Sequence, residues 1–344
     1  MRIDKKVLSL LDAAQVNCAP TKEECVFLLQ FPEVSLEAAL LRAVADSITR
    51  SRFDNEAIVL GQIGVEITAC PGKCKFCSFG EGHTTFEPSV MTDEEILRSA
   101  KNFTVSGELY ALFLMTMHTF NFERLVHIVQ IVRKVIPRET QIVVNIGDFD
   151  KAQGRDLRAV GVNGAYHVCR LREGVDTALD PEQRKATIRN IKDSGLDWYY
   201  CCEPIGPEHT SQELAEQIFI GLEYGCFQHA AMRRVYIPSA PLSVYGQISE
   251  LRLAQITAVV ALATLVSHDT KSIAVHEPNL LGLLGGANTV YAETGANPRD
   301  TQKDTAGHRG RDITDCKIML YEAGFQSLLA SPGKRISLTD AYRF

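Results

Sequence analysis

Three cysteines, Cys70, Cys74 and Cys77, lie within eight residues in the segment Cys-Pro-Gly-Lys-Cys-Lys-Phe-Cys. Thiolate sulfur is the usual protein ligand of iron–sulfur clusters, and three thiolates at this spacing can hold one face of a cuboidal 4Fe–4S cluster. Gly72 allows the chain between the first two cysteines to turn tightly. Because three ligands leave the fourth iron without a protein ligand, that iron can bind a small molecule.

The same cysteines also allow a zinc site, since zinc takes four Cys or His ligands and His83 is near enough in sequence to be the fourth. A chance grouping is the remaining alternative. The cluster is the favoured interpretation, because the triplet directly follows the first predicted strand. In an α/β barrel, the loops that follow the strands carry the chemistry.

The elements that position these cysteines alternate between short apolar segments and amphipathic helices from residue 63 onward. Eight such strands in sequence imply parallel strands, and eight is the number that closes a (β/α)8 TIM-type barrel. The fold class is therefore α/β, with a helical extension at 1–60, the barrel at 61–330 and a tail at 331–344. The predicted strands are residues 64–69, 110–115, 141–146, 165–171, 198–202, 231–237, 272–276 and 289–292.

The composition and charge of the chain limit the classes of protein to which it can belong. The 344 residues are 45% hydrophobic, ample for one large core, and the net charge of −6 without a basic cluster argues against a nucleic-acid partner. The most apolar stretch, residues 253–266, is too short to span a membrane, and the N-terminus lacks the apolar segment of a signal peptide. We therefore expect a cytoplasmic protein whose ten cysteines are metal ligands or core residues rather than disulfides.

The C-x3-C-x2-C spacing, with Phe76 before the last cysteine, resembles the motif of the radical S-adenosylmethionine (SAM) superfamily. There the open iron binds SAM, and one electron splits SAM into methionine and a 5′-deoxyadenosyl radical that abstracts hydrogen from a substrate. N-terminal helices, a full barrel and the segment Gly285-Gly-Ala-Asn288 resemble the biotin synthase-like group, which includes biotin synthase, a hydrogenase maturase and methylornithine synthase. The resemblance implies a 4Fe–4S cluster and SAM as cofactors, with Phe76 beside them.

The resemblance also implies that polar residues at the end of the fourth strand bind SAM. Arg172 and Glu173 are the leading pair and Arg170 is the second choice. An arginine can hold the SAM carboxylate, and a carboxylate can accept hydrogen bonds from both ribose hydroxyls. Arg184, early in the next helix, matches an arginine that reaches the SAM carboxylate in related enzymes. The alternative for all four is a solvated surface charge.

Two further strand ends are implied to contact SAM. Glu203 follows the fifth strand, whose end packs against adenine in the family; a purely structural turn is the alternative. After the second strand, the family carries Gly-Gly-Glu, whereas this chain has Thr-Met-His at residues 116–118. Thr116 or His118 would have to substitute for the missing carboxylate.

Polar residues after the later strands are candidates for binding the second substrate. They are Tyr236 after strand six, His276 and Glu277 after strand seven, and Arg299 after strand eight. Arg299 could clamp a carboxylate or phosphate through two hydrogen bonds. The alternatives are a structural histidine at position 276 and a solvated charged loop over residues 299–312.

Biotin synthase holds a second, sulfur-donating cluster through cysteines inside its barrel. The second and third strands of this chain contain no cysteine. Cys169, Cys201 and Cys202 lie on strands four and five, but only one of the adjacent pair can face the interior. The favoured prediction is therefore a radical SAM enzyme acting on a small biosynthetic intermediate, such as a metallocofactor precursor. A sulfur-inserting synthase of the biotin or lipoyl type and a zinc-stabilised ligand-binding barrel are the alternatives.

The predicted partners follow from this chemistry. They are a small-molecule substrate and an electron donor of the flavodoxin or ferredoxin type, because the chain carries no flavin-binding motif. Neither nucleic acid nor a membrane is expected as a partner, and a homodimer is compatible with the sequence.

Overall fold

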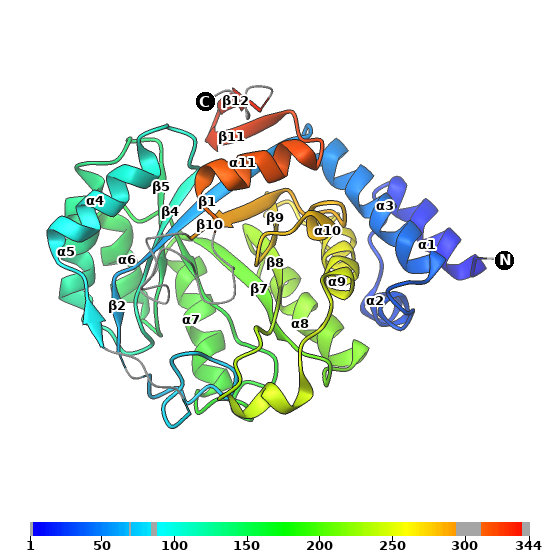
Figure 1. The fold of residues 1–344 in the computed structure, drawn as a ribbon, viewed down its shortest axis with the longest axis horizontal. Coiled ribbons are helices and arrows are strands. Elements are labelled where there is room, and N and C mark those ends of the chain that lie inside the picture. Colours follow the sequence, from blue (N-terminus) through cyan, green and yellow to red (C-terminus); the bar gives the residue numbers. More distant parts are fainter. Residues whose placement is uncertain (1–2, 69, 84–87, 294–310, 339–344) are drawn as a thin grey trace.

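The computed structural model of the protein describes residues 3–68, 70–83, 88–293 and 311–338. Eight parallel strands in these residues form one closed barrel, in the order β10-β9-β8-β7-β6-β5-β4-β1, and β1 pairs with β10 to close it (Figure 1). The predicted (β/α)8 architecture is confirmed. The strands are β1 (Glu56–Gly64), β4 (Ala111–Met115), β5 (Gln141–Asn145), β6 (Gly164–Tyr166), β7 (Asp197–Ile205), β8 (Gln228–Arg233), β9 (Ser272–Val275) and β10 (Thr289–Ala292).

Helices follow the barrel strands and cover the outside of the barrel. Several begin at a reciprocal cap, as Thr92 and Glu95 show: the Thr92 hydroxyl accepts from the Glu95 N–H, and the Glu95 carboxylate accepts from the Thr92 N–H. None of the described helices is long and apolar enough to cross a membrane. The helices are α4 (Asp93–Thr104), α5 (Phe122–Arg133), α6 (Lys151–Ala159), α7 (Pro181–Asp193), α8 (Ser211–Glu223), α9 (Glu250–Ala263), α10 (Leu280–Leu283) and α11 (Ile313–Glu322).

Among the described residues, four short strands and one 3-10 helix lie outside the barrel. β2 (Glu66–Ile67) and β3 (Ser89–Val90) pair antiparallel on either side of the cysteine loop. The 3-10 helix η1 (Pro241–Tyr245) lies between β8 and α9. After α11, β11 (Ser327–Ser331) pairs with the start of β1, and β12 (Lys334–Ser337) pairs with β11.

The first barrel strand begins earlier than predicted. β1 occupies Glu56–Gly64, whereas the sequence predicts helices up to residue 60 and a strand at 64–69. All nine residues of β1 are buried, so the strand lacks the alternation of apolar and polar residues that marks a half-exposed strand. The cysteines therefore follow β2 rather than coming directly after the barrel strand.

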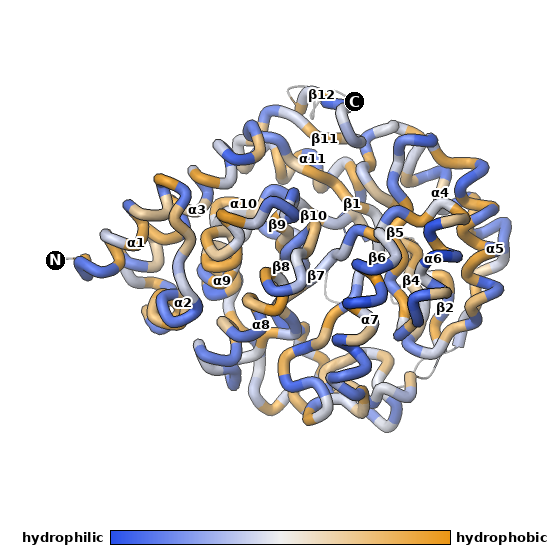
Figure 2. Tube along the Cα trace, turned by 180° about the vertical axis from the view of Figure 1, so that it is seen from behind, coloured by the Kyte–Doolittle hydropathy of each residue, from blue (hydrophilic) through white to orange (hydrophobic). Residues whose placement is uncertain are grey.

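The N-terminal helices α1 (Lys5–Gln15), α2 (Lys22–Leu29) and α3 (Leu36–Arg52) pack on the barrel beside α8 and α9 (Figure 1). Every residue from Leu253 to Ala263 in α9 is buried, because the barrel covers one side and these helices cover the other. The hydropathy colouring in Figure 2 shows apolar residues recurring along α9. Gln255 fixes the contact by donating from Nε2 to the carbonyl oxygens of Leu28 and Phe31, at 3.1 and 3.0 Å.

Aromatic side chains fill the middle of the barrel. The ring of Phe113 lies 5.2 Å from the rings of both Tyr199 and Tyr291, edge to face in each case, and Tyr199 also contacts Phe227 at 5.1 Å. Such packed layers are typical of small barrels. The hollow part of the interior therefore lies above this layer, at the carboxyl ends of the strands.

Candidate active site

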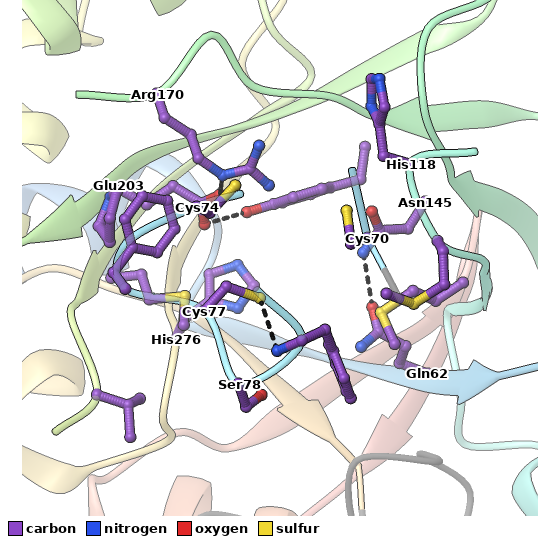
Figure 3. Close-up of a pocket in the computed structure, with 18 of the residues that line it drawn as sticks. Gln62, Cys70, Cys74, Cys77, Ser78, His118, Asn145, Arg170, Glu203 and His276 are labelled. Atoms are coloured by element: carbon purple, nitrogen blue, oxygen red, sulfur yellow. Dashed lines mark hydrogen bonds and ion pairs between the residues drawn. The ribbon is translucent and has the colours of Figure 1, made fainter. Parts of the chain in front are cut away.

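The cysteine loop closes over a cavity of about 240 Å³ at the carboxyl ends of the barrel strands. Cys70, Cys74 and Cys77 all line this cavity, and Figure 3 shows their side chains around one shared space. The opposite walls come from the ends of several different strands. This is the face on which α/β barrels carry their active sites.

Backbone hydrogen bonds hold the cysteine loop against two neighbouring loops. The N–H of Lys75 donates to the carbonyl of Asp176 at 2.9 Å, and the N–H of Ala178 donates to the carbonyl of Gly72 at 2.7 Å. On the other side, the N–H of Leu242 in η1 donates to the carbonyl of Lys75 at 3.2 Å. The spacing of the three thiols is therefore set by the fold.

In the described residues, His83 is not grouped with the three thiols as the fourth ligand of a zinc site. His83, the predicted fourth zinc ligand, instead hydrogen-bonds through Nε2 to the carbonyl oxygen of Cys77 at 2.9 Å. Within the described ranges, no three His, Cys, Asp or Glu side chains converge closely enough to hold one metal ion. A cuboidal cluster needs a wider spacing, because each thiolate binds a different iron.

Arg170, Glu203 and Tyr166 form a hydrogen-bonded group on the cavity wall. Arg170 Nε lies 3.0 Å from Glu203 Oε1, and the Tyr166 hydroxyl donates to Glu203 Oε2 at 2.7 Å. Burial alone lowers the pKa of Arg170, but Glu203 and Glu173 outweigh it and raise that pKa above its ordinary value. The two Nη groups of Arg170 make no hydrogen bond to any described residue. Arg170 thus presents a permanent positive charge with free donors to the cavity.

Arg184 also lines the cavity, but the protein occupies most of its donors. Nη1 donates to Asp148 Oδ1 at 3.0 Å, while Nε and Nη2 donate to the carbonyl of Val168 at 3.1 and 2.9 Å. The guanidinium is almost completely buried. Arg184 is therefore held rigidly, and it has less capacity than Arg170 to bind a ligand.

Asp148, which the sequence analysis did not single out, lies at the centre of this second group. Burial alone raises its pKa, but His167, whose Nε2 lies 3.3 Å from Asp148 Oδ1, and the charge of Arg184 outweigh that effect and hold the pKa well below its usual range. The Thr187 hydroxyl adds a hydrogen bond at 2.9 Å. Asp148 lies three residues beyond the end of β5, so its position in the loop after a barrel strand was the available signal.

The end of β4 brings Thr116 and His118 to the cavity. A Cβ at Gly147 would lie 1.8 Å from the carbonyl oxygen of His118, so only glycine allows the ends of β4 and β5 to approach this closely. His118 Nε2 lies 3.9 Å from Asp148 Oδ2. Burial and the charge of Arg184 lower the pKa of His118, so its imidazole is neutral at pH 7 and can accept a hydrogen bond.

The two leading candidates from the fourth strand do not line the cavity. Arg172 has a φ of 54° and points to α8, where its Nε lies 2.7 Å from Glu213 Oε1. Glu173 is buried and accepts from the Arg170 N–H at 2.8 Å and from the Thr177 hydroxyl at 2.6 Å. These contacts close the turn that follows β6. They argue against a direct cofactor role for Arg172 and Glu173, and they make Arg170 the stronger candidate.

Of the remaining predicted site residues, some line the cavity and others do not. His276 and Glu277 line the cavity, whereas Tyr236 lies three residues beyond β8 and points outward with 52% of its surface exposed. Arg299 lies outside the described residues. The predicted residues that line the cavity are Phe76, Thr116, His118, Arg170, Arg184, Glu203, His276 and Glu277.

Two amides that the sequence analysis missed lie on the cavity floor. Asn145 on β5 donates from Nδ2 to Gln62 Oε1 on β1 at 3.0 Å. Gln62 is a buried polar side chain in the apolar part of β1 that follows Glu56, which was the signal that it contacts a cavity. Beside the amides, His276 stacks on Tyr291 with ring centres 4.3 Å apart.

The other cysteines on or near the strands do not line this cavity in the described residues, although Cys201 lies beside Tyr166 and Glu203, which do. Cys169, Cys201 and Cys202 are all buried, and burial raises the pKa of the Cys169 thiol to about 11. In the described part of the chain, the cavity is lined by no cysteine beyond the triplet. These residues pack as small apolar side chains.

The closed barrel, with three cysteines in the loop after its first strand, is the arrangement of the class that the sequence resembles. No family model matches the chain. Over 279 residues it is 22% identical to a biotin synthase from Magnetococcus marinus, covering 74% of this chain and 79% of that protein.

Two solved structures share the fold. A methylornithine synthase is similar with a TM-score of 0.77 and 19% identity, covering 92% of this chain and 96% of that one. The FeFe-hydrogenase maturase HydG from Carboxydothermus hydrogenoformans is similar with a TM-score of 0.76 and 14% identity, covering 94% of this chain and 79% of that one. The predicted resemblance to the biotin synthase-like group of radical SAM enzymes is confirmed.

Proposed function

We propose that this protein is a radical SAM enzyme that holds a 4Fe–4S cluster through Cys70, Cys74 and Cys77 and acts on a small biosynthetic intermediate. When bound, the cluster supplies the electron that splits SAM into methionine and a hydrogen-abstracting 5′-deoxyadenosyl radical. One observation carries the proposal: the three thiols line the same cavity as Arg170 and Glu203, the groups suited to bind SAM. The sequence similarity to a biotin synthase supports the same class.

Arg170 is the residue that we expect to bind the SAM carboxylate. Its Nη groups are free of hydrogen bonds to described residues, and its pairing with Glu203 orients the guanidinium. A fork of two N–H donors on a carboxylate is the strongest pairing available to an arginine. Arg184, held by Asp148, adds positive charge behind it.

Glu203 and His118 are the expected partners for the other polar groups of SAM. A carboxylate has about four acceptor positions, so Glu203 can bind a ribose hydroxyl while it holds Arg170 and Tyr166. His118 is neutral and lines the cavity, so it can accept from the SAM ammonium where the family carries a carboxylate. Thr116 and Phe76 border the same space.

The second substrate is expected deeper in the barrel. Gln62, Asn145 and His276 line that part of the cavity and can donate or accept hydrogen bonds. This wall suits a small polar molecule rather than a hydrophobic one. Electrons would come from an external carrier of the flavodoxin or ferredoxin type, and a cytoplasmic location and a homodimer belong to the same proposal.

The metal content of anaerobically reconstituted protein tests this function against its alternatives. The proposal predicts about four iron and four sulfide per chain. Clearly more iron would favour a sulfur-inserting synthase with a second cluster, although among the described residues no cysteine beyond the triplet lines the cavity. A colourless protein that contains zinc would refute both.

A further inference from the structure

A tyrosine and a buried thiol lie next to each other at the inner wall of the cavity. Tyr166 ends β6 and lines the cavity, and its hydroxyl donates to Glu203 Oε2 at 2.7 Å. In the sheet, Tyr166 pairs with Tyr199 of β7. Because alternate residues of a strand share a face, Tyr199, Cys201 and Glu203 all point into the barrel. The Cys201 thiol therefore lies between the aromatic layer and the cavity, beside the Tyr166 hydroxyl.

Both of these groups keep their hydrogen at neutral pH. Burial raises the pKa of Tyr166 well above its ordinary value, and the neighbouring Cys201 and Glu203 raise it further. Burial likewise raises the pKa of the Cys201 thiol, and Glu203 adds to this, whereas the hydrogen bond with Tyr166 acts in the opposite direction. A phenolic O–H and a thiol S–H are therefore present side by side, because their ionised forms are strongly disfavoured in this apolar setting.

Among the described residues that line the cavity, Tyr166 is the side chain suited to give a hydrogen atom to a carbon radical. Phenolic O–H and thiol S–H bonds are weaker than aliphatic C–H bonds, so a carbon radical can take their hydrogen. The alcohol O–H bonds of Ser78 and Thr116 are too strong for this step. Tyr291 also lines the cavity, but its hydroxyl accepts from Gln228 Nε2 at 2.7 Å, in the barrel core. The thiols of the triplet are assigned to the cluster.

We propose that Tyr166 donates a hydrogen atom to the carbon radical formed in this cavity, and that Cys201 then restores Tyr166. The inference rests on the proposed function, because that function supplies the radical. The C–H bond of the product forms as the Tyr166 O–H bond breaks, which leaves a phenoxyl radical. The phenoxyl oxygen takes the hydrogen atom of the Cys201 S–H bond, which leaves a thiyl radical. One electron from the same external one-electron carrier and one proton from water convert the thiyl radical back to the thiol.

The burial of Cys201 suits a role that acts through Tyr166. Cys201 is fully buried and does not line the cavity, so a substrate reaches the Tyr166 hydroxyl but not the Cys201 sulfur. A thiyl radical at that position is separated from the product, which prevents it from taking the hydrogen back. Each turnover then consumes one SAM molecule and a second electron in addition to the one that cleaves SAM.

The test follows deuterium into 5′-deoxyadenosine formed from SAM alone, without a second substrate. The cluster-loaded full chain, equilibrated in D2O, carries deuterium on its exchangeable O–H and S–H groups but not on its C–H groups. With titanium(III) citrate as a thiol-free reductant, the 5′-deoxyadenosyl radical should take its hydrogen from Tyr166, so mass spectrometry should find one deuterium in the nucleoside. Tyr166→Phe should lose this label. Tyr199→Phe is the matched control and should keep it, because Tyr199 is buried in the aromatic layer and does not line the cavity.

Cys201→Ala separates the restoring step from the first transfer. Without the thiol, the first nucleoside formed on each chain should carry the label, and the label should fall in later turnovers. The phenoxyl radical should persist as a tyrosyl signal in electron paramagnetic resonance, and Tyr166→Phe should lack that signal. Cys202→Ala is the matched control, because Cys202 is equally buried but shares the outward face of β7 with Tyr200, whose hydroxyl donates to the carbonyl of Gln217 in α8 at 2.9 Å. It should behave as the wild type.

Different outcomes identify what fails. Unlabelled 5′-deoxyadenosine from the wild type, or equal label in Tyr166→Phe, overturns the inference and leaves SAM cleavage intact. A Cys201→Ala variant that matches the wild type in label and shows no lasting tyrosyl signal overturns the role of Cys201. If Cys201→Ala instead lowers the iron content of the reconstituted protein, Cys201 is a ligand of a second cluster and the inference is wrong. A wild type that forms no 5′-deoxyadenosine overturns the proposed function itself.

Discussion

Arg170 and Arg172 are two residues apart, yet their side chains have opposite surroundings. Arg170 faces the cavity beside Glu203, whereas Arg172 pairs with Glu213 on α8. The left-handed backbone at Arg172, with φ at 54°, turns that side chain away from the cavity. The sequence predicts that this charged segment lies at a strand end, but not which arginine faces inward, because β6 ends at Tyr166 and the register is lost in the turn.

Replacing each arginine by glutamine tests this assignment. Arg170→Gln should weaken SAM binding about 10- to 100-fold, the range for loss of a charge-assisted hydrogen bond. Arg172→Gln is the matched control and should change the dissociation constant little. Calorimetric titration of cluster-loaded protein with SAM measures both. Stronger loss of binding in Arg172→Gln would contradict the assignment.

Asp148→Asn tests the buried group that holds Arg184. The variant removes the nearer counter-charge of the buried Arg184 and leaves only Glu173, whose Oε2 lies 3.8 Å from Arg184 Nε, so the free energy of unfolding should fall by about 3 kcal/mol at pH 7. Because the pKa of Asp148 is held below its ordinary value, its contribution is present above about pH 3.9 and is lost as the pH falls further. The difference between wild type and variant should therefore shrink in acid.

Denaturant titrations at several pH values measure this difference. Asp193→Asn is the control, because Asp193 pairs with Lys151 at 2.8 Å on the surface and about half of each side chain is exposed. That substitution should cost less than about 1 kcal/mol. An Asp148→Asn variant as stable as its control would show that Asp148 does not hold the group together.

Among the elements, the ends of β4 and β5 illustrate how the fold positions the site. A Cβ at Gly147 would overlap the carbonyl oxygen of His118, so Gly147→Ala should push these strand ends apart. Overpacking of this kind costs about 1–3 kcal/mol of stability. The displaced His118 and Asp148 should also weaken SAM binding.

Gly333→Ala separates the effect on the site from the effect on stability. Gly333 has open space around it but a φ of 80°, so alanine there should cost a similar 1–2 kcal/mol. It lies in the turn between β11 and β12, remote from the cavity lining. Unaltered SAM binding in Gly147→Ala, measured beside Gly333→Ala, would contradict the proposed role of the close approach.

The helices and strands differ in how well the local sequence predicts them. The helix starts at Thr92, Asp180 and Thr210 were predictable, because capping is local chemistry within three residues. β1 was not, because its burial on both sides depends on helices and strands remote in sequence. The cysteine triplet was recognisable for the same reason as the caps: its spacing is local.

At the scale of the whole molecule, the N-terminal helices and the barrel share one hydrophobic core. Leu41 of α3 belongs to the same buried cluster as the barrel strands, so Leu41→Ala should lower the free energy of unfolding by about 2–5 kcal/mol. The single tryptophan, Trp198, is buried in β7 and reports on the barrel. In Leu41→Ala, the unfolding midpoint followed by Trp198 fluorescence and the one followed by far-UV circular dichroism should fall together.

Leu8→Ala on α1 is the control, because Leu8 is 39% exposed. It should change both unfolding midpoints little. Two separate unfolding transitions in Leu41→Ala, with the fluorescence-detected midpoint equal to that of the wild type, would show that the N-terminal helices unfold on their own.

The most direct test of the function is the yield of 5′-deoxyadenosine from reconstituted protein, SAM and a strong one-electron reductant under anaerobic conditions. The wild type and Cys18→Ala, which removes an exposed cysteine outside the loop, should both form it, while Cys74→Ala should form none. Equal yields from Cys74→Ala and the wild type would contradict SAM cleavage at the cysteine triplet.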